Sequence, residues 1–362
     1  PCFTDSILTQ PYGGFCAVGC AFCYINNGGR GYRGQGVTVV DPTYPEKTIK
    51  LFKSMRTGAA VYMSSFIDPF LEVEKYYHNT KKVSQAAINE GLPIFFLTRK
   101  KVPGWAYDHL KKNKYSYMQF SINTPSGEDW KLLSPKAVSL DTMLGQVGEM
   151  HRQKIYVSIQ VNPIMAGVVT NDDIIKLIHM LKERGADHLI FKFVEIVFPS
   201  APSMINQMRV RFRGRADKFE ALFTQNIGGV KSVDEDYRKE GLMRFWKECK
   251  KTKITMSLCY EYEYERNKKG EVISKVGRSM GRADAKGHPF ISADQCHGHR
   301  VPVYSRKDTM DKFKPIEACP DTGCLHCADD VGGEKKVPCG NELLAFAPAW
   351  TPDMLKQPAY TV

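Results

Sequence analysis

The stretch IYVSIQVNPIMAGVVTNDDIIKLIHMLKERGADHLIFKFV, residues Ile155–Val194, contains a strand, a helix and a second strand in succession. Its two ends, Ile155–Asn162 and His188–Val194, are mostly apolar and β-branched, which is typical of strands buried on both faces. Between them, Asn171–Gly185 opens with the cap-type residues NDD, carries apolar residues at helical spacing and stops at a glycine. This order predicts two parallel strands joined by a right-handed helical crossover.

The same alternation extends towards the N-terminus. Further strands are predicted at Ser6–Gln10, Ala60–Ser65, Pro93–Thr98 and Tyr117–Asn123. Further helices are predicted at Pro45–Met55, Val73–Asn89 and Leu140–Gln153. Strand and helix in turn, repeated five or six times, predict an α/β fold with a parallel sheet.

The alternation stops after about Phe198. A helix at Glu235–Lys250 and a strand at KITMSLC follow, and from Gly277 the chain is rich in loop residues and cysteines. We therefore expect three parts: a barrel over 1–200, the end of the barrel with a basic and helical insertion over 201–276, and a cysteine-rich extension over 277–362.

Composition narrows the class of protein. The chain has 362 residues, no run of about 18 apolar residues and no signal-peptide pattern, so we expect a cytoplasmic protein without a membrane span. Eleven cysteines in such a protein favour metal or redox ligands over a disulfide framework. The formal charge of +12 is compatible with a polyanionic partner and equally with a basic enzyme.

The segment GGFCAVGCAFCYINNGG begins at Gly13 and places cysteines at Cys16, Cys20 and Cys23. A cubane [4Fe–4S] cluster held by three thiolates keeps one iron open for a small ligand, whereas structural zinc usually takes four ligands. The loop follows the first predicted strand, so it would lie at the carboxyl ends of the strands, where such sheets bind their ligands.

C-x3-C-x2-C followed by an aromatic residue resembles the radical S-adenosylmethionine (radical SAM) superfamily. The resemblance implies a partial (β/α)6-type barrel, a [4Fe–4S] cluster at the three cysteines and SAM chelated to the open iron. It also implies reductive cleavage of SAM to a 5′-deoxyadenosyl radical, with electrons from a flavodoxin- or ferredoxin-type donor. Phe22 and Tyr24, on either side of Cys23, are candidate cofactor contacts.

Three later motifs resemble the spore photoproduct lyase and DNA-repair-photolyase-like branch of this superfamily: SSFIDPFLEVE (Ser64–Glu74), FLTRK (Phe96–Lys100) and QFSIN (Gln119–Asn123). Carried over, the resemblance implies SAM contacts from Ser65, Asp68, Lys100 and Ser121. A carboxylate and hydroxyls suit the ammonium and ribose of SAM, and a lysine suits its carboxylate.

The chain departs from the spore lyase at one position. That enzyme has a cysteine just before the aspartate, and the cysteine returns a hydrogen atom to the product radical. Here the neighbouring residues are Phe66 and Ile67. The resemblance therefore supports the branch and not repair of a thymine dimer.

A second cysteine cluster lies in the extension. CPDTGCLHC and VPCG supply Cys319, Cys324, Cys327 and Cys339 in a plant-ferredoxin-like spacing. The residues leave open an auxiliary Fe–S cluster, a structural zinc, or thiols that bind substrate, including a soft metalloid such as arsenite. Further candidate ligands are Cys259, Cys296, His297 and His299.

The signals for the substrate are weaker. MRVRFRGRADKF carries Arg209, Arg211, Arg213 and Arg215 at a period of two. On an extended segment these arginines would follow a phosphate backbone, with Tyr32 and Phe212 for stacking; solvated basic loops are the alternative. CYEYEYE reads as a strand with an aromatic face.

Two classes of function remain. The first is a radical SAM enzyme acting on nucleic acid or a nucleotide. The second is radical SAM modification of a peptide or small molecule, including a metalloid, held near the C-terminal cysteines. A non-catalytic Fe–S or zinc-binding nucleic-acid module is a weaker third alternative.

Overall fold

The computed structural model of the chain describes residues 6–27, 36–198, 200–274, 280, 290, 292, 296–299 and 301–315. The cysteines Cys319, Cys324, Cys327 and Cys339, predicted to form a second metal site, lie outside these ranges.

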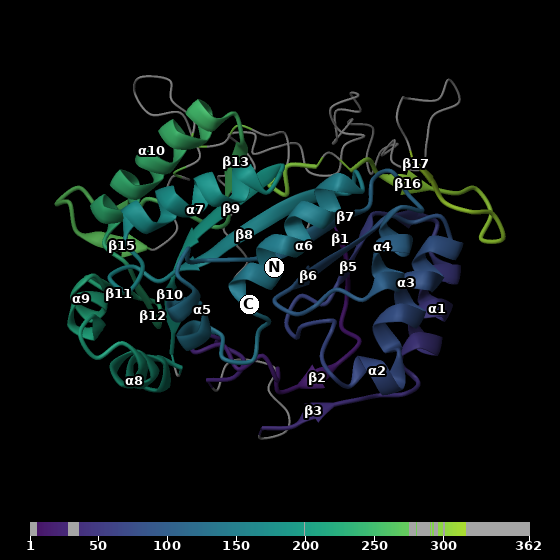
Figure 1. Ribbon diagram of the computed structural model, residues 1–362, viewed down its shortest axis with the longest axis horizontal. Coiled ribbons are helices and arrows are strands. Elements are labelled where there is room, and N and C mark those ends of the chain that lie inside the picture. Colours follow the sequence, from purple (N-terminus) through teal and green to yellow (C-terminus); the bar gives the residue numbers. More distant parts are fainter. Residues whose placement is uncertain are drawn as a thin grey trace.

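A seven-stranded sheet with the order β1-β5-β6-β7-β8-β9-β13 forms the centre of the molecule, and every neighbouring pair in it is parallel (Figure 1). The strands are β1 (Ser6–Thr9), β5 (Ala60–Met63), β6 (Ile94–Thr98), β7 (Tyr117–Ser121), β8 (Tyr156–Ile164), β9 (His188–Phe193) and β13 (Thr255–Leu258). Among the described residues no pairing joins β1 to β13, so the barrel is open. The predicted α/β fold with a partial parallel barrel is confirmed, and KITMSLC supplies the seventh strand.

Helices cover the outer face of this sheet, with α1, α3 and α4 at one end of it and α7 and α10 at the other (Figure 1). The helices of the described part of the chain are α1 (Tyr44–Ser54), α2 (Glu74–Tyr77), α3 (Asn79–Asn89), α4 (Gly104–Leu110), α5 (Gly127–Leu133), α6 (Leu140–Arg152), α7 (Asn171–Glu183), α8 (Ala201–Arg211), α9 (Ala216–Ala221) and α10 (Glu235–Thr252). Helix α7 starts at a capping box formed by Thr170 and Asp173, so its N-cap lies one residue before the NDD opening, and Asp173 is the member of NDD that takes part. The predicted single helix Val73–Asn89 is instead two helices, because His78 adopts a φ of 56°.

The remaining strands are short and form small separate sheets. They are β2 (Gly13–Gly14), β3 (Thr38–Val39), β4 (Thr57–Gly58), β10 (Glu195–Val197), β11 (Gln225–Ile227), β12 (Val230–Ser232), β14 (Glu265–Arg266), β15 (Val272–Ser274), β16 (Tyr304–Ser305) and β17 (Lys314–Pro315). The hairpin β2–β3 and helix α8 lie along the lower edge of Figure 1, and β16 and β17 lie along the upper edge.

The inner face of the sheet is aromatic near its amino end. The rings of Tyr62 and Phe95 stack with centroids 4.4 Å apart, and Tyr117 continues the stack at 4.6 Å from Phe95. Further along the strands the inner face turns polar, where Gln119 Nε2 and Ser158 Oγ are buried without a hydrogen-bond partner among the described residues. Buried polar groups of this kind usually bind water or a ligand, so the interior is not a purely apolar core.

Residues 296–299 fill the amino end of the barrel interior. His297 lies 5.1 Å from the Phe95 ring, and His299 stacks on Tyr156 at 4.5 Å. Gly298 has a φ of +77° and passes so close to His188 that a Cβ there would clash. His297 is buried inside the barrel, whereas His299 is half-buried at its amino end. Within the described part of the chain no three or more His, Cys, Asp or Glu side chains surround a single-ion site.

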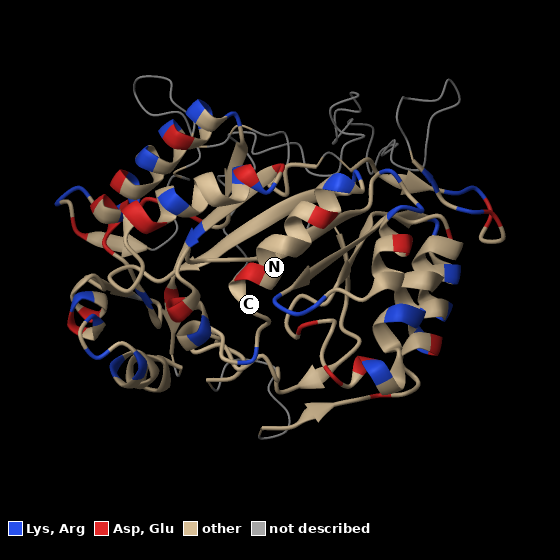
Figure 2. Cartoon of the chain, viewed as in Figure 1, with Lys and Arg blue, Asp and Glu red and all other residues tan. Residues whose placement is uncertain are grey.

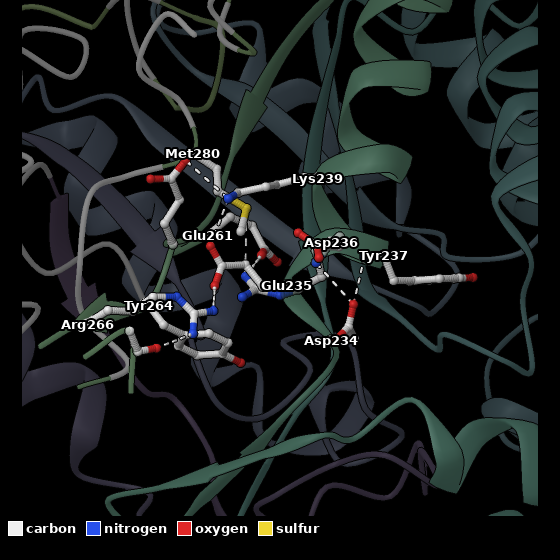
Figure 3. A network of polar contacts seen from close by, with 12 residues as sticks. Asp234, Glu235, Asp236, Tyr237, Lys239, Glu261, Tyr264, Arg266 and Met280 are labelled. Carbon is white, nitrogen blue, oxygen red and sulfur yellow. Dashed lines mark hydrogen bonds and ion pairs between the residues drawn. The ribbon is translucent and has the colours of Figure 1, made fainter. Parts of the chain in front are cut away.

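A buried ion pair joins α10 to the segment that follows β13. Arg238 Nη1 donates to Glu261 Oε2 at 2.7 Å, and the two side chains are only 7% and 2% exposed. Beside this pair, Glu235 binds Lys239 at 2.8 Å and Arg266 at 2.9 Å (Figure 3). This network attaches the segment that follows β13 to helix α10.

One strand prediction is wrong, and the arginine-rich segment is not extended. CYEYEYE leaves the sheet at Cys259 and turns at Tyr260, whose φ is 54°, so its tyrosines do not share one face. The arginine-rich MRVRFRGRADKF begins in α8 and ends in α9. In a helix, residues two apart point in different directions, and the arginines accordingly do not form one row.

Among the described residues, no helix combines the length and the apolar composition that crossing a bilayer requires. Lys and Arg alternate with Asp and Glu along α10 and over other helices, so the excess positive charge is spread over the chain rather than gathered in one helix (Figure 2).

Candidate active site

The loop that carries the three cysteines follows the carboxyl end of β1. The side chain of Asn26 forms two hydrogen bonds with the backbone of Cys16. Its Oδ1 accepts from the Cys16 N–H at 3.2 Å, and its Nδ2 donates to the Cys16 carbonyl at 3.0 Å. Asn27 Nδ2 donates to the Cys23 carbonyl at 2.8 Å. The two asparagines of CYINN therefore fold the loop back on itself and hold the backbone of Cys16 and Cys23 in place.

The rest of the barrel holds this loop in place. Ala21 N–H donates to the Leu133 carbonyl at 2.9 Å, and Lys136 N–H donates to the Val18 carbonyl at 3.2 Å. The thiol of Cys20 lies 3.3 Å from Ser134 Oγ. Helix α5 and the turn after it thus form one wall of the cysteine loop.

The thiols of the cysteine loop interact electrostatically with Cys20 and with the guanidinium of Arg99. Burial raises the pKa of the Cys16 thiol, and it raises the pKa of Cys23 to about 11, with a further contribution from Cys20 to each. The guanidinium of Arg99 lies within electrostatic range of all three sulfurs.

This donor set fits a [4Fe–4S] cluster. Each thiolate of such a cluster binds a different iron, so the sulfurs stand farther apart than the ligands of one ion, in agreement with the lack of a single-ion site in the described part of the chain. Arg99 supplies positive charge beside three sulfurs that must lose their protons to bind metal.

Arg99, which was not among the candidate residues from the sequence, is buried beside the three thiols. It is 6% exposed, and its guanidinium donates to Ser121 Oγ at 2.7 Å, Ser134 Oγ at 3.2 Å and Asn123 Oδ1 at 3.3 Å. It also lies against the rings of Phe22 and Trp130, with centroid distances of 4.9 and 5.0 Å. A buried arginine held by neutral oxygens is oriented towards the thiols.

Lys100, which the resemblance put in this role, points elsewhere. Its Nζ donates to the Lys136 carbonyl at 2.9 Å. Side chains alternate along a strand, and Phe95 of β6 faces the barrel interior, so Arg99 is in phase with that face and Lys100 is not. The strand IFFLT is apolar on both faces, so the sequence alone does not show which phase faces the interior.

Asp68 connects the turn after β5 to the end of β6. It accepts from Thr98 Oγ1 and from the Arg99 N–H, each at 2.8 Å, and from the Phe70 N–H at 2.9 Å. Burial raises the pKa of Asp68, and these hydrogen bonds oppose the increase. Its charge interacts with Cys16, so the carboxyl lies at the edge of the thiol site.

The structure brings most of the candidate residues together at one end of the barrel. Phe22 and Ser121 contact Arg99 directly. Ser65 is half-buried in the turn that carries Asp68, whereas Tyr24 is 39% exposed at the rim of the loop.

A hollow of about 290 Å³ opens beside the cysteine loop. It is lined by Phe15, Ala17, Gly19, Cys20, Ala21, Asn26, Asn27, Pro135, Lys136, Gln207 and Arg211. Cys16, Cys23 and Arg99 do not line it, so the hollow lies on a different side of the loop from the guanidinium.

An open parallel barrel whose first loop directs three thiols towards a buried cation defines a class: a barrel enzyme with a three-cysteine cluster loop. A relative from Pseudomonas phage M6, named radical SAM Nalpha-GlyT isomerase, is 46% identical over 359 residues, which are 98% of this chain and 72% of the relative. The chain belongs to the radical SAM enzymes. The identification predicted from the cysteine loop is thereby confirmed.

Solved structures share the fold. A spore photoproduct lyase structure matches with a TM-score of 0.51 and 16% identity, over 68% of this chain and 74% of the lyase. SuiB of Streptococcus suis matches with a TM-score of 0.46 and 12% identity, over 71% of this chain and 49% of SuiB. No family model matches the chain.

Proposed function

We propose that this radical SAM enzyme is an isomerase and that its substrate is Nalpha-GlyT or a close analogue. The observation that carries the proposal is the 46% identity over 98% of the chain to a relative of that name. The site is compatible with it, because the lyase-type thiol is replaced by Phe66 and Ile67.

We assign the cofactor contacts from the geometry. Cys16, Cys20 and Cys23 would hold a [4Fe–4S] cluster, which when bound supplies the electron that cleaves SAM to methionine and a 5′-deoxyadenosyl radical. Arg99, fixed by Ser121, would hold the carboxylate of SAM, since a guanidinium suits a carboxylate and its own partners are neutral. Asp68 and Ser65 are assigned to the polar groups of SAM, and Phe22 orients Arg99 by stacking on it.

An isomerisation makes a specific demand on the chemistry. It leaves the composition of the substrate unchanged, so a hydrogen atom removed from the substrate must return to the product, and no net electrons are consumed. With no thiol at Phe66 or Ile67 to donate it, return from 5′-deoxyadenosine is the simplest route. SAM would then be regenerated rather than consumed.

The test is a product and cofactor balance under anaerobic conditions. The reconstituted protein is reduced with dithionite and given SAM and Nalpha-GlyT. We expect a product of unchanged mass and altered proton spectrum, with many product molecules per 5′-deoxyadenosine. A product of different mass would contradict the isomerase proposal, whereas one 5′-deoxyadenosine per product would contradict the regeneration of SAM.

We further propose that the group on which the enzyme acts is part of a nucleic acid. The formal charge of +12 supports this. The arginines of MRVRFRGRADKF do not, because Arg209 pairs with Glu220 at 2.6 Å and Arg215 pairs with Asp129. Phe212 is buried and is therefore not available to stack on a base. Binding of DNA that weakens steeply with added salt would support a nucleic-acid substrate. A peptide or small molecule held at the C-terminal cysteines is the alternative, and binding unaffected by salt would favour it.

A further inference from the structure

The hollow beside Cys20 is the feature that the proposed reaction leaves unexplained. Cys20 is the only one of the three cluster cysteines in its lining. A cluster held by this loop would therefore come nearest to the hollow through Cys20. The turn Ser134–Lys136 forms one side, and the 3.3 Å contact between Cys20 Sγ and Ser134 Oγ ties the thiol to that side.

Helix α8 forms the other side of the hollow. Ser203 Oγ donates to Asn27 Oδ1 at 2.5 Å and binds the helix to the cysteine loop. One turn further along α8, Gln207 Oε1 accepts from Arg211 Nε at 2.8 Å. The hollow is thus built from three separate parts of the chain that are joined by hydrogen bonds.

Two cations line this hollow, and no ion pair is described for either of them within the described part of the chain. Arg211 donates to Gln207 and, through Nη1, to the Leu132 carbonyl at 2.8 Å, so its contacts are neutral oxygens. The side chain of Lys136 is exposed, and its backbone alone anchors the turn. By contrast, the nearby Arg209 and Arg215 are both paired with carboxylates.

We propose that this hollow is the docking surface for an acidic one-electron donor protein of the flavodoxin or ferredoxin type. The proposal rests on the proposed function, which requires one electron to reach a cluster on this loop. A donor that gives up one electron here is oxidised by one electron as the cluster is reduced by one, so no further co-reactant is needed. Unpaired positive charge on the rim attracts an acidic partner and increases its rate of association.

Nucleic acid is the other polyanion that a basic hollow could bind, and the geometry disfavours it. A substrate must reach the inner side of the barrel, where Arg99 and Ser121 lie. Arg99 is absent from the lining of the hollow, which opens beside Cys20 instead. A donor needs only proximity to the cluster and gains nothing from access to the barrel interior.

The experiment compares two reductants on the same variants. In Lys136→Glu/Arg211→Glu, we expect the rate of reduction by reduced flavodoxin at low salt to fall at least about tenfold, because rim charges govern association. Reduction by dithionite, a small ion that needs no docking surface, should stay within about twofold. Lys112→Glu reverses an exposed charge in the turn after α4, outside the lining of the hollow, and should leave both rates unchanged.

Binding gives a readout that is independent of activity. Oxidised flavodoxin titrated into the iron-free protein should bind the wild type more weakly as salt increases, and should bind the double variant at least about tenfold more weakly. Should Arg211→Glu unfold the turn, the exposed Lys136→Gln alone still tests the surface with a smaller effect in the same direction.

Three results would overturn the inference. Equal flavodoxin rates in wild type and variants would place the donor elsewhere. Equal loss of rate with dithionite would mean that the variants damage the cluster site. Weakened binding of DNA with unchanged binding of flavodoxin would assign the hollow to nucleic acid. Failure of the proposed isomerisation would leave the reduction rates measurable, so the two failures are distinguishable.

Discussion

Arg99 shows what sequence reasoning can and cannot settle about a single residue. FLTRK offers two adjacent cations at a strand end, and motif resemblance selected Lys100. The strand decides otherwise, since only the residue in phase with Phe95 faces the interior. The sequence predicted a cation at the end of this strand. Which of Arg99 and Lys100 faces the barrel interior could be seen only from the orientation of β6.

Replacing Arg99 tests this assignment. Arg99→Leu removes a charged donor from Ser121, Asn123 and Ser134 and the cation beside the thiols. Hydrogen bonds to charged groups contribute about 1.5–3 kcal/mol, so we expect SAM to bind roughly 10- to 100-fold more weakly. Lys100→Leu should change SAM affinity less than about threefold, because its Nζ binds a backbone carbonyl instead. Titration of SAM into the reconstituted variants measures both, and equal losses would return the role to Lys100.

At the scale of elements, buried strands and capped helices were predictable, and short surface helices were not. The sheet strands and α7 follow from apolar runs and cap residues. Helix α8 was misread because arginines alternate with Val210 and Phe212 as they would on a strand. The segment forms a helix because Met204 and Met208, four residues apart, are then buried on the same side.

The ion pair of Arg238 and Glu261 belongs to this scale, because it fastens α10 to the segment after β13. Glu261→Gln leaves a buried guanidinium without its charge partner, so we expect a loss of about 3–5 kcal/mol in the free energy of unfolding. Asp41→Asn breaks the exposed pair with Lys47 and should leave the free energy of unfolding nearly unchanged. Urea denaturation of both variants checks this difference, and similar losses would show that burial does not govern the pair.

His188 makes the attachment of residues 296–299 sensitive to acid. Its imidazole bonds Thr255 and Ser257 and faces the Cys296 carbonyl, and burial, together with the nearby His297, lowers its pKa to about 3. The unfolded chain takes up this proton near pH 6.5, so the stabilising contribution is complete above that pH and is lost as the pH falls towards 3.

This shift predicts a measurable pH dependence. Between pH 7 and pH 5 the group alone should lower the free energy of unfolding by about 2 kcal/mol. His188→Gln should flatten the dependence by about one proton in that range while destabilising the protein at pH 7. Denaturation midpoints across the range test it, and parallel curves for the two proteins would exclude His188 as the cause.

For the whole molecule, the alternation of strands and helices predicted the architecture, and the cysteine spacing predicted the class of enzyme. The closure of the barrel interior by residues 296–299 could not be predicted. It depends on a pairing of CHGH with rings of Phe95 and Tyr156, more than a hundred residues away, which no local pattern encodes.

Iron content tests the metal sites of the whole chain. Cys16→Ala, Cys20→Ala or Cys23→Ala should abolish formation of 5′-deoxyadenosine and remove about four irons per chain after anaerobic reconstitution. If Cys324 belongs to a second cubane, the wild type should contain about eight irons and Cys324→Ala about four. A wild type with about four irons, all responsive to SAM by EPR, would instead point to zinc or a soft substrate atom at the C-terminal cysteines.

The positions of residues 296–299 and 301–315 mean that a truncated form of the protein should retain them. Arg306, whose side chain is fully buried, bonds Glu90 at 2.6 Å and the Phe52 carbonyl at 2.6 Å, and His297 lies inside the barrel. An expression fragment that stops before Cys296 would expose the stacked rings of Tyr62, Phe95 and Tyr117 to water, and would be recovered in inclusion bodies rather than as a minimal catalytic unit.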